Sequence, residues 1–497
     1  MNVLIFRGTN DIDGIDYAID FIQKGDTVFV IQCDGSIGVC PWNSNMNSLC
    51  CKYCHAVSVK SFKKLCPKGY EYVSMGSLIT EEDRKKSRDF TMDFNSIAEM
   101  KSILYNNVEV GFGAFSSYAT ASRNVMPNIT QEFKNYIFYM IRMEICIYEA
   151  VNRYVNNNKI ELIIFHNGRF AMYRPFLGVA KNNHISYIAT EHYTRNGVKY
   201  KNDFINDVPH SVKGNIDKAV ALWNSIDEET RLEKGRGFYE KRRHGIAAGD
   251  KVYIKKQVAD KLPDDWNDEL ENIAIFNSSE DEFCAISKEM DDMQLFPNQY
   301  VALHSIFEHY KDDKKKHFYL RIHPNLIDVP YISHMALYDL KYDNVTILPP
   351  DSPISSYALM DKADKIIVFN STMGLESAYW GKPVIALTKF YASELNLAYY
   401  SETTDGLWVL INDEQLEPLK NSNAEMMGNY FLRATHPYKH INIKMTINHR
   451  GEKYPLESVT QCLGSYKLFY IVFRFFNKLH GFSNFSKFKK LPETIGQ

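Results

Sequence analysis

One stretch of the chain, residues 363–386, restricts the fold more than any other. Residues 366–369 form a short apolar run typical of a buried parallel strand. A polar loop of Asn370, Ser371 and Thr372 follows and opens a predicted helix, which ends near Gly381. A second apolar run at residues 384–387 predicts the next strand. This order of strand, helix and strand is the unit of a parallel sheet covered by helices.

The predicted helix start is a candidate ligand site. The first turn of a helix presents unpaired backbone N–H groups and a partial positive charge, which favour phosphate or sugar hydroxyls. Ser371 and Thr372 stand at this start, and Glu376 follows one turn later, where a carboxylate could hold ribose hydroxyls. The alternative is an ordinary strand and helix in which Ser371 and Thr372 only cap the helix.

Two further predicted strands end in polar residues. Residues 318–325 predict a strand that ends in Arg321, His323 and Pro324. Residues 345–357 predict another strand, followed by a polar loop and a second helix start. Ligands bind at the carboxyl ends of strands in parallel sheets, so these three strand ends predict one site on one edge.

These motifs resemble a known family. The order Arg-x-His-Pro, Pro-x-Ser-x-x-Ser-Ser-Tyr and Asn-Ser-Thr-x-Gly-x-Glu is similar to that of bacterial capsule-polysaccharide glycosyltransferases of the GT-B fold, including those that add Kdo. The His-Pro and Ser-Thr pairs also resemble nucleotide-binding motifs of bacterial sialyltransferases. The resemblance covers residues 272–387 and extends more loosely to Asn167-Gly-Arg169 and Glu191-His192.

The resemblance implies an activity and a set of roles. The activity is transfer of a sugar from a nucleotide-sugar donor, CMP-Kdo or a CMP-nonulosonate, to a growing capsule or lipopolysaccharide-type glycan, free or lipid-linked. His323 and Arg321 would neutralise the leaving phosphate, and the start of the helix would hold the nucleotide. Ser279 follows the first strand of the second half, in a loop expected to face the cleft.

The catalytic base is expected from the first half of the chain. Glu191 and His192 follow a predicted strand at residues 186–189, and Asn167 and Arg169 occupy the equivalent edge one strand earlier. We take Glu191 as the base and the other three as acceptor-side residues. Weaker candidates for the base are His210, Asp203 and Asp34.

The sequence favours sugar transfer that needs no metal or other cofactor. Asp11 and Asp13 have the spacing of a metal-binding Asp-x-Asp motif, but they follow the first strand with no supporting pattern. Many retaining GT-B enzymes carry a second Glu eight residues after the first. Val384 stands eight residues after Glu376, which favours an inverting reaction.

Six of the nine cysteines fall within the first 66 residues. Cys51 and Cys54 have the two-residue separation of a zinc knuckle, and Cys33 and Cys40 would complete four thiolates of a structural zinc site. Residues 32–56 lack a periodic apolar pattern, so we expect a loop that a bound metal would stabilise. The alternative is a set of small buried thiols without metal. Other candidate ligands are Cys50 and His55.

Composition limits the partners and the compartment. The net charge of −2 over 497 residues gives no bulk attraction for nucleic acid. We expect a cytoplasmic protein, because no leader and no run of about 18–20 apolar residues is visible. Residues 467–490 are basic and aromatic without an acid, which favours peripheral contact with an anionic membrane. The alternative is a helix packed on the first domain, followed by a solvated tail.

The pattern of elements predicts an α/β protein with two Rossmann-like domains that face a cleft. We assign residues 1–243 to the first domain, 244–271 to a linker, 272–412 to the donor domain and 413–497 to C-terminal helices and the tail. The resemblance implies that the C-terminal helices cross back to the first domain. In the first domain we expect strands at 2–6, 27–32, 108–115, 162–165 and 186–189 and helices at 130–156, 174–182 and 215–243. In the C-terminal region we expect helices at 424–434 and 464–479.

Two other functions compete with sugar transfer. A nucleotide-sugar epimerase of the same fold would need no acceptor. Its cleft usually carries more acidic and histidine residues than these motifs supply. A GT-B scaffold without catalysis, which binds a polysaccharide-assembly partner, would not need His323, Ser371 and Glu376.

Overall fold

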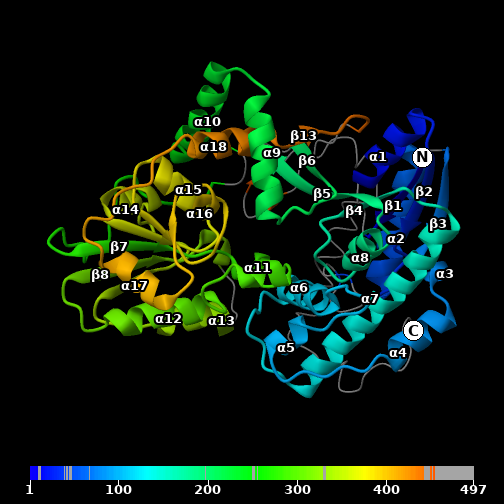
Figure 1. Cartoon of the computed structure of the whole chain (residues 1–497), viewed down its shortest axis with the longest axis horizontal. Helices are drawn as coiled ribbons and strands as arrows, with labels where there is room; N and C mark the ends of the chain where they lie inside the picture. Colours follow the sequence, from blue (N-terminus) through cyan, green and yellow to red (C-terminus); the bar gives the residue numbers. More distant parts are fainter. Residues whose placement is uncertain are drawn as a thin grey trace.

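The computed structural model forms two α/β domains, each built on a largely parallel sheet (Figure 1). This confirms the predicted fold class, two Rossmann-like domains that face a cleft in the GT-B arrangement. The structure describes residues 1–8, 13–38, 40, 43, 48–66, 68–195, 198–248, 252–254, 256–327, 332–441, 448–449 and 452–453. Within these ranges, none of the helices has both the length and the apolar character needed to cross a bilayer.

The first sheet has the strand order β13-β6-β5-β4-β1-β2-β3. The five strands β1 to β5 are parallel, whereas β6 runs antiparallel to β5 and β13 antiparallel to β6. The strand order reverses between β1 and β4, so the topological switch point lies at the carboxyl ends of these two strands. The bounds are β1 Asn2–Arg7, β2 Thr27–Gln32, β3 Tyr70–Ser74, β4 Leu162–His166, β5 Ser186–Arg195, β6 Val198–Ile205 and β13 His436–Pro437.

Helices cover both faces of the first sheet, which explains its continuous apolar strands. Phe6 on β1 points to a core with α6, α7 and α8, where its ring stacks on Phe176. Ile5 points to the opposite core, with α1 and α2. The helices are α1 Asp13–Gln23, α2 Ser48–Leu65, α3 Met75–Leu78, α4 Glu81–Asp89, α5 Ile97–Lys101, α6 Val110–Ser122, α7 Gln131–Asn157 and α8 Arg174–Asn182.

The second sheet is parallel throughout, with the order β12-β11-β10-β7-β8-β9 and its switch point between β7 and β10. Its strands are β7 Glu271–Phe276, β8 Lys316–Arg321, β9 Val345–Leu348, β10 Lys365–Val368, β11 Val384–Ala386 and β12 Tyr399–Tyr400. Its helices are α11 Lys288–Asp292, α12 Gln299–Tyr310, α13 Ile332–Met335, α14 Ser356–Lys362, α15 Thr372–Tyr379, α16 Tyr391–Glu394 and α17 Thr404–Asn412.

Three helices, α9 Val212–Asn224, α10 Glu228–Arg243 and α18 Asn423–Arg433, lie together beside the second domain (Figure 1). Phe238 and Tyr239 of α10 share a core with Met427 of α18 and with the second sheet. A Cβ on Gly235 would lie 2.3 Å from a backbone oxygen of α18, so glycine allows the close crossing of α10 and α18. The helix α10, before the assigned boundary at residue 243, therefore packs on the donor domain, whereas Lys218 of α9 also donates to Asn202 in β6 of the first domain.

The chain returns to the first domain after α18, as the family resemblance implied. β13 pairs with β6 of the first sheet, and Ile441 packs in a core of that domain. Tyr438 Oη donates a hydrogen bond to Asp13, and the backbone N–H of His440 donates one to Asp16 Oδ1 at 2.7 Å. The helix predicted at residues 464–479 and the basic tail at 467–490 lie outside the described residues.

Two local predictions are wrong. Residues 108–115, expected as a strand, lead into α6, which is buried on nearly all sides. A short apolar run of this kind has no period that separates a buried helix from a strand. The expected loop around Cys51 and Cys54 is the helix α2, where residues three apart share one face.

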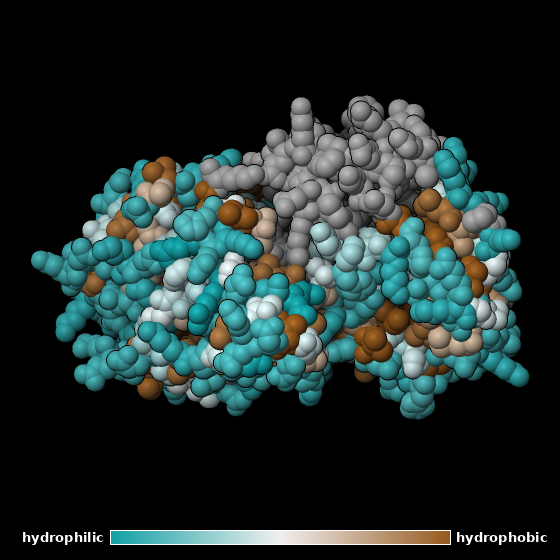
Figure 2. Space-filling view, turned by 90° about the horizontal axis from the view of Figure 1, so that it is seen from above, coloured by the Kyte–Doolittle hydropathy of each residue, from teal (hydrophilic) through white to brown (hydrophobic). Residues whose placement is uncertain are grey.

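Hydrophilic side chains dominate the described surface in the view of Figure 2, and hydrophobic ones form small separate groups. Isolated exposed residues such as Ile205 and Val409 are ordinary for a globular protein. The described surface in this view therefore shows no large hydrophobic patch of the kind that binds a partner.

Candidate functional site

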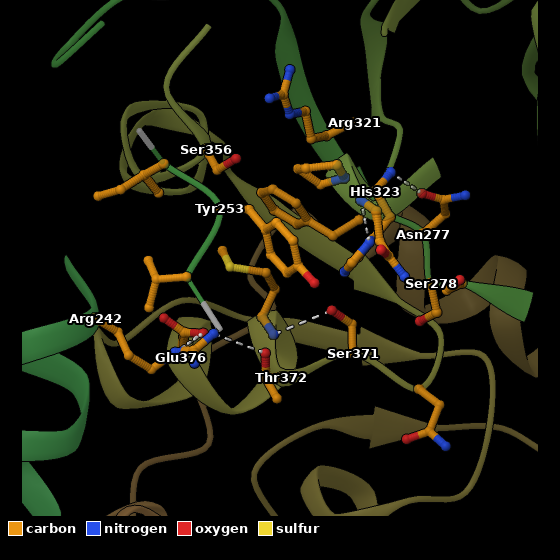
Figure 3. Close-up of a pocket in the computed structure, with 18 of the residues that line it drawn as sticks. Arg242, Tyr253, Asn277, Ser278, Arg321, His323, Ser356, Ser371, Thr372 and Glu376 are labelled. Atoms are coloured by element: carbon orange, nitrogen blue, oxygen red, sulfur yellow. Dashed lines mark hydrogen bonds and ion pairs between the residues drawn. The ribbon is translucent and has the colours of Figure 1, made fainter. Parts of the chain in front are cut away.

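A cavity of about 290 Å³ lies at the switch point of the second sheet (Figure 3). The loops after β7, β8 and β10 line it, as do the first turn of α15 and residues of α10 and α14. All six predicted donor-side residues contribute to this one lining, because parallel strands end on a common edge. They are Ser279, Arg321, His323, Ser371, Thr372 and Glu376.

The start of α15 forms one wall of the cavity. Ser371 is the N-cap, and its Oγ accepts a hydrogen bond from the Met373 backbone N–H at 3.3 Å. Thr372 is the first residue of the helix and lines the cavity beside it. Capping satisfies one N–H group, while the partial positive charge of the helix end remains at the cavity wall. This wall suits a phosphate group.

Glu376 has a different set of contacts from the predicted one. The side chain is only 1% exposed, and Arg242 Nε donates to its Oε1 at 3.0 Å. Tyr357 Oη donates to the other carboxylate oxygen, and Arg242 Nη2 donates to Thr372 Oγ1 at 3.5 Å. Both oxygens thus hold protein partners in this structure. Glu376 fixes Arg242 at the cavity, and its contact with ribose stays a prediction.

Sequence reasoning missed Arg242. It belongs to the run of Lys241, Arg242 and Arg243 at the end of α10, a pattern typical of solvated residues that complement the helix dipole. The structure buries Arg242 between α10 and α15 instead, and it lines the cavity. No local signal in the sequence distinguishes it from its two neighbours.

Arg321 and Ser279 are also engaged with protein groups. Arg321 donates to the carbonyl oxygens of Pro349 and Ser352 at 3.1 and 3.2 Å, so its guanidinium holds the loop before α14. Burial lowers the pKa of Arg321 to about 10, and the side chain stays charged at neutral pH. Ser279 Oγ donates to Asp281 Oδ1 at 2.8 Å. A phosphate could bind Ser279 only after an exchange of partners, whereas Arg321 Nε is buried without a partner among the described residues.

His323 lines the same cavity and has a defined tautomer. Its Nδ1 accepts a hydrogen bond from the Asn325 backbone N–H at 3.1 Å, so the ring proton lies on Nε2. The His323 backbone N–H donates to Asn277 Oδ1 at 2.7 Å, and Tyr253 packs edge-on against the ring at 5.4 Å. The neutral ring therefore carries one N–H donor of the kind that stabilises a leaving phosphate.

A second cavity of about 310 Å³ extends the site toward the first domain. It shares Arg242, Ser371 and Thr372 with the first cavity, and Glu191 and His210 of the first domain are among its other polar lining residues. Aromatic side chains make up much of the rest of its lining, among them Phe238, Tyr391, Tyr430 and Phe431. The two cavities therefore form a continuous cleft between the two domains.

Glu191, in β5, accepts hydrogen bonds from two neighbours. Asn167 Nδ2 donates to its Oε2, and the His192 backbone N–H donates to its Oε1 at 3.3 Å. Burial opposes ionisation of Glu191, but His166 and His192 together with Asn167 lower its pKa below the ordinary value. Glu191 is therefore a carboxylate at neutral pH.

His210 lines the second cavity, whereas Asn167 and Arg169, in the turn after β4, line a separate cavity that His210 also borders. Burial lowers the pKa of His210 to about 3, and Arg169 adds to the effect, so His210 is neutral. Asn167 adopts a left-handed backbone conformation with φ of 57°, followed by Gly168 with φ of 84°. Arg169 Nη1 donates to the Glu282 carbonyl oxygen at 2.7 Å, which makes it a contact between the two domains.

The remaining predicted residues lie elsewhere on the first domain. His192 lies beside His166 and Asp13 and is not among the residues that line the two cavities. Asp203 accepts a hydrogen bond from Tyr17, and Asp34 accepts hydrogen bonds from Ser36 and Ser74. These contacts give the two aspartates structural partners outside the cleft.

The four predicted zinc ligands are neighbours in the structure. Burial raises the pKa of the Cys33 thiol, and the nearby thiols of Cys40, Cys54 and Cys51 add to the effect. Asn43 Nδ2 donates to Cys51 Sγ at 3.0 Å. Among the described residues, however, the group whose ligating atoms all lie within 4.8 Å of one another is formed by other side chains. Structural zinc at these cysteines stays a prediction.

No protein-family model matches the chain, and a search of curated proteins gives no match. Solved structures with similar folds include a beta Kdo 2,4 transferase, KpsC of Thermosulfurimonas dismutans, at 13% identity and a TM-score of 0.36, covering 55% of this chain and 79% of that one. UDP-GlcNAc 2-epimerase of Neisseria meningitidis has 13% identity and a TM-score of 0.29, covering 87% and 97%. The calicheamicin glycosyltransferase CalG4 has 11% identity and a TM-score of 0.23, covering 87% and 93%. At these values the likeness carries no argument about activity.

Proposed function

We propose that this protein is a glycosyltransferase that moves a sugar from a nucleotide-sugar donor to a glycan. The observation that carries the proposal is the continuous cleft, with a phosphate-suited helix start on one side and the ionised Glu191 on the other. The motif resemblance favours CMP-Kdo or a CMP-nonulosonate as donor and a capsule or lipopolysaccharide-type glycan, free or lipid-linked, as acceptor.

The donor nucleotide binds in the cavity of the second domain. Its phosphate lies at the start of α15 near Ser371 and Thr372, where Arg242 adds a positive charge already oriented by Glu376. The Nε2–H of His323 hydrogen-bonds the phosphate oxygens as negative charge develops on them. This donor N–H stabilises the leaving group without proton transfer.

The acceptor occupies the part of the cleft lined by aromatic side chains. Glu191 takes the proton of the acceptor hydroxyl while its oxygen bonds to the anomeric carbon and the bond from that carbon to phosphate breaks. Asn167 orients the carboxylate through its amide. A single displacement of this kind inverts the anomeric centre, and no step in it uses a metal or another cofactor.

A nucleotide-sugar epimerase is the second candidate, and one observation favours it. The first sheet gathers more acidic and histidine side chains at its edge than the sequence motifs suggested, namely Asp13, His166, Glu191, His192 and His210. An epimerase needs acid and base groups for proton transfer but no acceptor. Incubation with donor alone separates the two functions, because an epimerase converts the sugar nucleotide without acceptor. A scaffold without catalysis would convert no sugar nucleotide, with or without acceptor.

A nucleotide screen tests the donor site. We expect CMP or CMP-sugars to raise the melting temperature more than UDP, GDP or TDP, and substitution of Thr372 by Arg to abolish the shift by filling the cavity. The control is Thr404→Arg on α17, a helix that does not line the cavity. A shift that survives Thr372→Arg in a folded variant would place the nucleotide elsewhere.

The basic residues 467–490 give a separate prediction of contact with an anionic membrane surface. Co-sedimentation with vesicles that contain anionic lipid should fall when the chain is shortened to residue 466. Equal sedimentation of both chains would remove this role from the tail.

A further inference from the structure

Asp13, His166 and His192 form a compact group at the carboxyl edge of the first sheet. Asp13 begins α1, His166 ends β4 and His192 lies in β5. One potential ligand atom of each lies within 4.8 Å of the other two. His192 Nδ1 is 3.8 Å from Asp13 Oδ2, and the two imidazole rings lie 5.0 Å apart between centroids. We call these three residues the Asp-His-His cluster.

One nitrogen of this cluster has no partner among the described residues. His166 Nδ1 is buried, and no hydrogen bond to it is present there. Burial of a polar atom without a partner is unfavourable, and a bound ion or water at the atom removes that cost. An imidazole nitrogen with a free lone pair is also the form that binds a metal.

The carboxylate of the cluster is held in place by two hydroxyl groups. Thr190 Oγ1 donates to Asp13 Oδ2 at 3.3 Å, and Tyr438 Oη donates to Asp13 Oδ1. Thr190 and His192 reach the same carboxylate because alternate residues of β5 point to the same face of the sheet. Hydrogen bonds of this kind orient the ligands of protein metal sites.

We propose that the Asp-His-His cluster binds one divalent transition-metal ion, with Zn²⁺ as the best chemical fit. Two imidazoles and one carboxylate suit Zn²⁺ and related transition metals, whereas Mg²⁺ and Ca²⁺ prefer oxygen ligands. Tetrahedral zinc places N and O ligands about 3.3 Å apart. The 3.8 Å between His192 and Asp13 is within reach of a small side-chain movement.

Three protein ligands leave one coordination position open for water or a substrate oxygen. The His192 side chain is 41% exposed, so a metal ion can reach this ligand from solvent. The three ligands all come from the first domain, and the site does not depend on the proposed sugar transfer. Its test can therefore fail or succeed separately from that function.

Cobalt is the probe for this site, because Co²⁺ binds like zinc and absorbs visible light. Protein made without a metal-affinity tag is stripped with a chelator and titrated with Co²⁺, and Zn²⁺ is then used as a competitor. We expect one equivalent of Co²⁺ bound through nitrogen and oxygen, without the charge-transfer absorption of thiolate ligands. The Cys51→Ser variant should bind Co²⁺ as the unchanged protein does.

Two variants of the cluster decide the assignment. His192→Ala removes a half-exposed ligand and should weaken Co²⁺ binding at least about 100-fold. Thr190→Val keeps the shape but removes the hydrogen bond to Asp13, and should weaken it about 10- to 100-fold, the usual cost of losing a supporting partner. The control is His304→Ala, an exposed histidine on α12.

Absence of Co²⁺ and Zn²⁺ binding by the unchanged protein would overturn the proposal. Unchanged affinity in a folded His192→Ala variant would do the same. Loss of binding in Cys51→Ser, with retention in His192→Ala, would assign the metal to the cysteines instead.

Discussion

Arg242 and Glu376, 134 positions apart in the sequence, form a buried ion pair with Nε and Oε1 3.0 Å apart. The pair joins α10 to α15 and fixes a positive charge at the cavity beside the start of α15. It thereby links the helices that pack on the second domain with the loop predicted to hold phosphate.

Removal of one member of this pair should destabilise the protein strongly. Glu376→Gln leaves the buried Arg242 charge without its counter-ion, which typically costs about 3–5 kcal/mol. The double variant Arg242→Met, Glu376→Gln should recover part of that loss, because no unpaired charge remains. Urea unfolding of both variants measures the effect. Arg243→Met, which breaks a more exposed pair with Asp361, is the control and should cost at most about 1 kcal/mol.

His323→Ala should lower turnover about 100- to 1000-fold without loss of the fold, since it removes one N–H donor to the developing phosphate charge. The measurement is initial rate with donor and acceptor, together with the melting temperature. His304→Ala on α12 is the matched control and should keep full activity. Near-normal turnover by folded His323→Ala would take His323 out of the mechanism.

Glu191→Gln should abolish turnover and leave donor binding intact, because the carboxylate faces the acceptor part of the cleft. Glu82→Gln, on the exposed face of α4, is the control. Weaker nucleotide binding by Glu191→Gln would instead assign Glu191 to the donor side.

The same residue predicts the acid limb of the pH profile. His166, His192 and Asn167 outweigh burial and lower the pKa of Glu191, so the catalytic carboxylate form persists as the pH falls through the ordinary titration range of a glutamate. Turnover should therefore decline on the acid side only below about pH 4.5 on account of this group. An acid limb centred near neutral pH that Glu191→Asp shifts would contradict the lowered pKa.

The pKa of Glu280 is raised, in contrast to that of Glu191, and this shift should make the stability of the protein depend on pH. Burial raises its pKa from 4.5 to about 7, so the folded protein binds more protons than the unfolded chain between these values. The free energy of unfolding should then decrease as the pH rises through this window. Urea unfolding at several pH values should show a smaller decrease for Glu280→Gln than for the unchanged protein. The exposed Glu269→Gln is the control, and equal slopes for all three proteins would refute the shift.

The sequence predicted the strand ends of the second domain because their pattern is local. Apolar runs followed by polar loops mark parallel strands, and parallel strands place their carboxyl ends on one edge whatever the details of packing. For this reason Ser371, Thr372 and His323 line one cavity as expected. The direction of each side chain is not a local property, and the guanidinium of Arg321 is used for the carbonyl oxygens of Pro349 and Ser352.

By itself the sequence determined the two Rossmann-like domains, the return of the C-terminal segment through the family resemblance, and the edge at which the donor site lies. Only the tertiary structure decided that Arg242 meets Glu376 and that Asp13 meets His192, 179 positions later in the chain. The physical reason is that periodicity encodes which face of an element is buried, whereas contacts between distant segments depend on how those elements pack together.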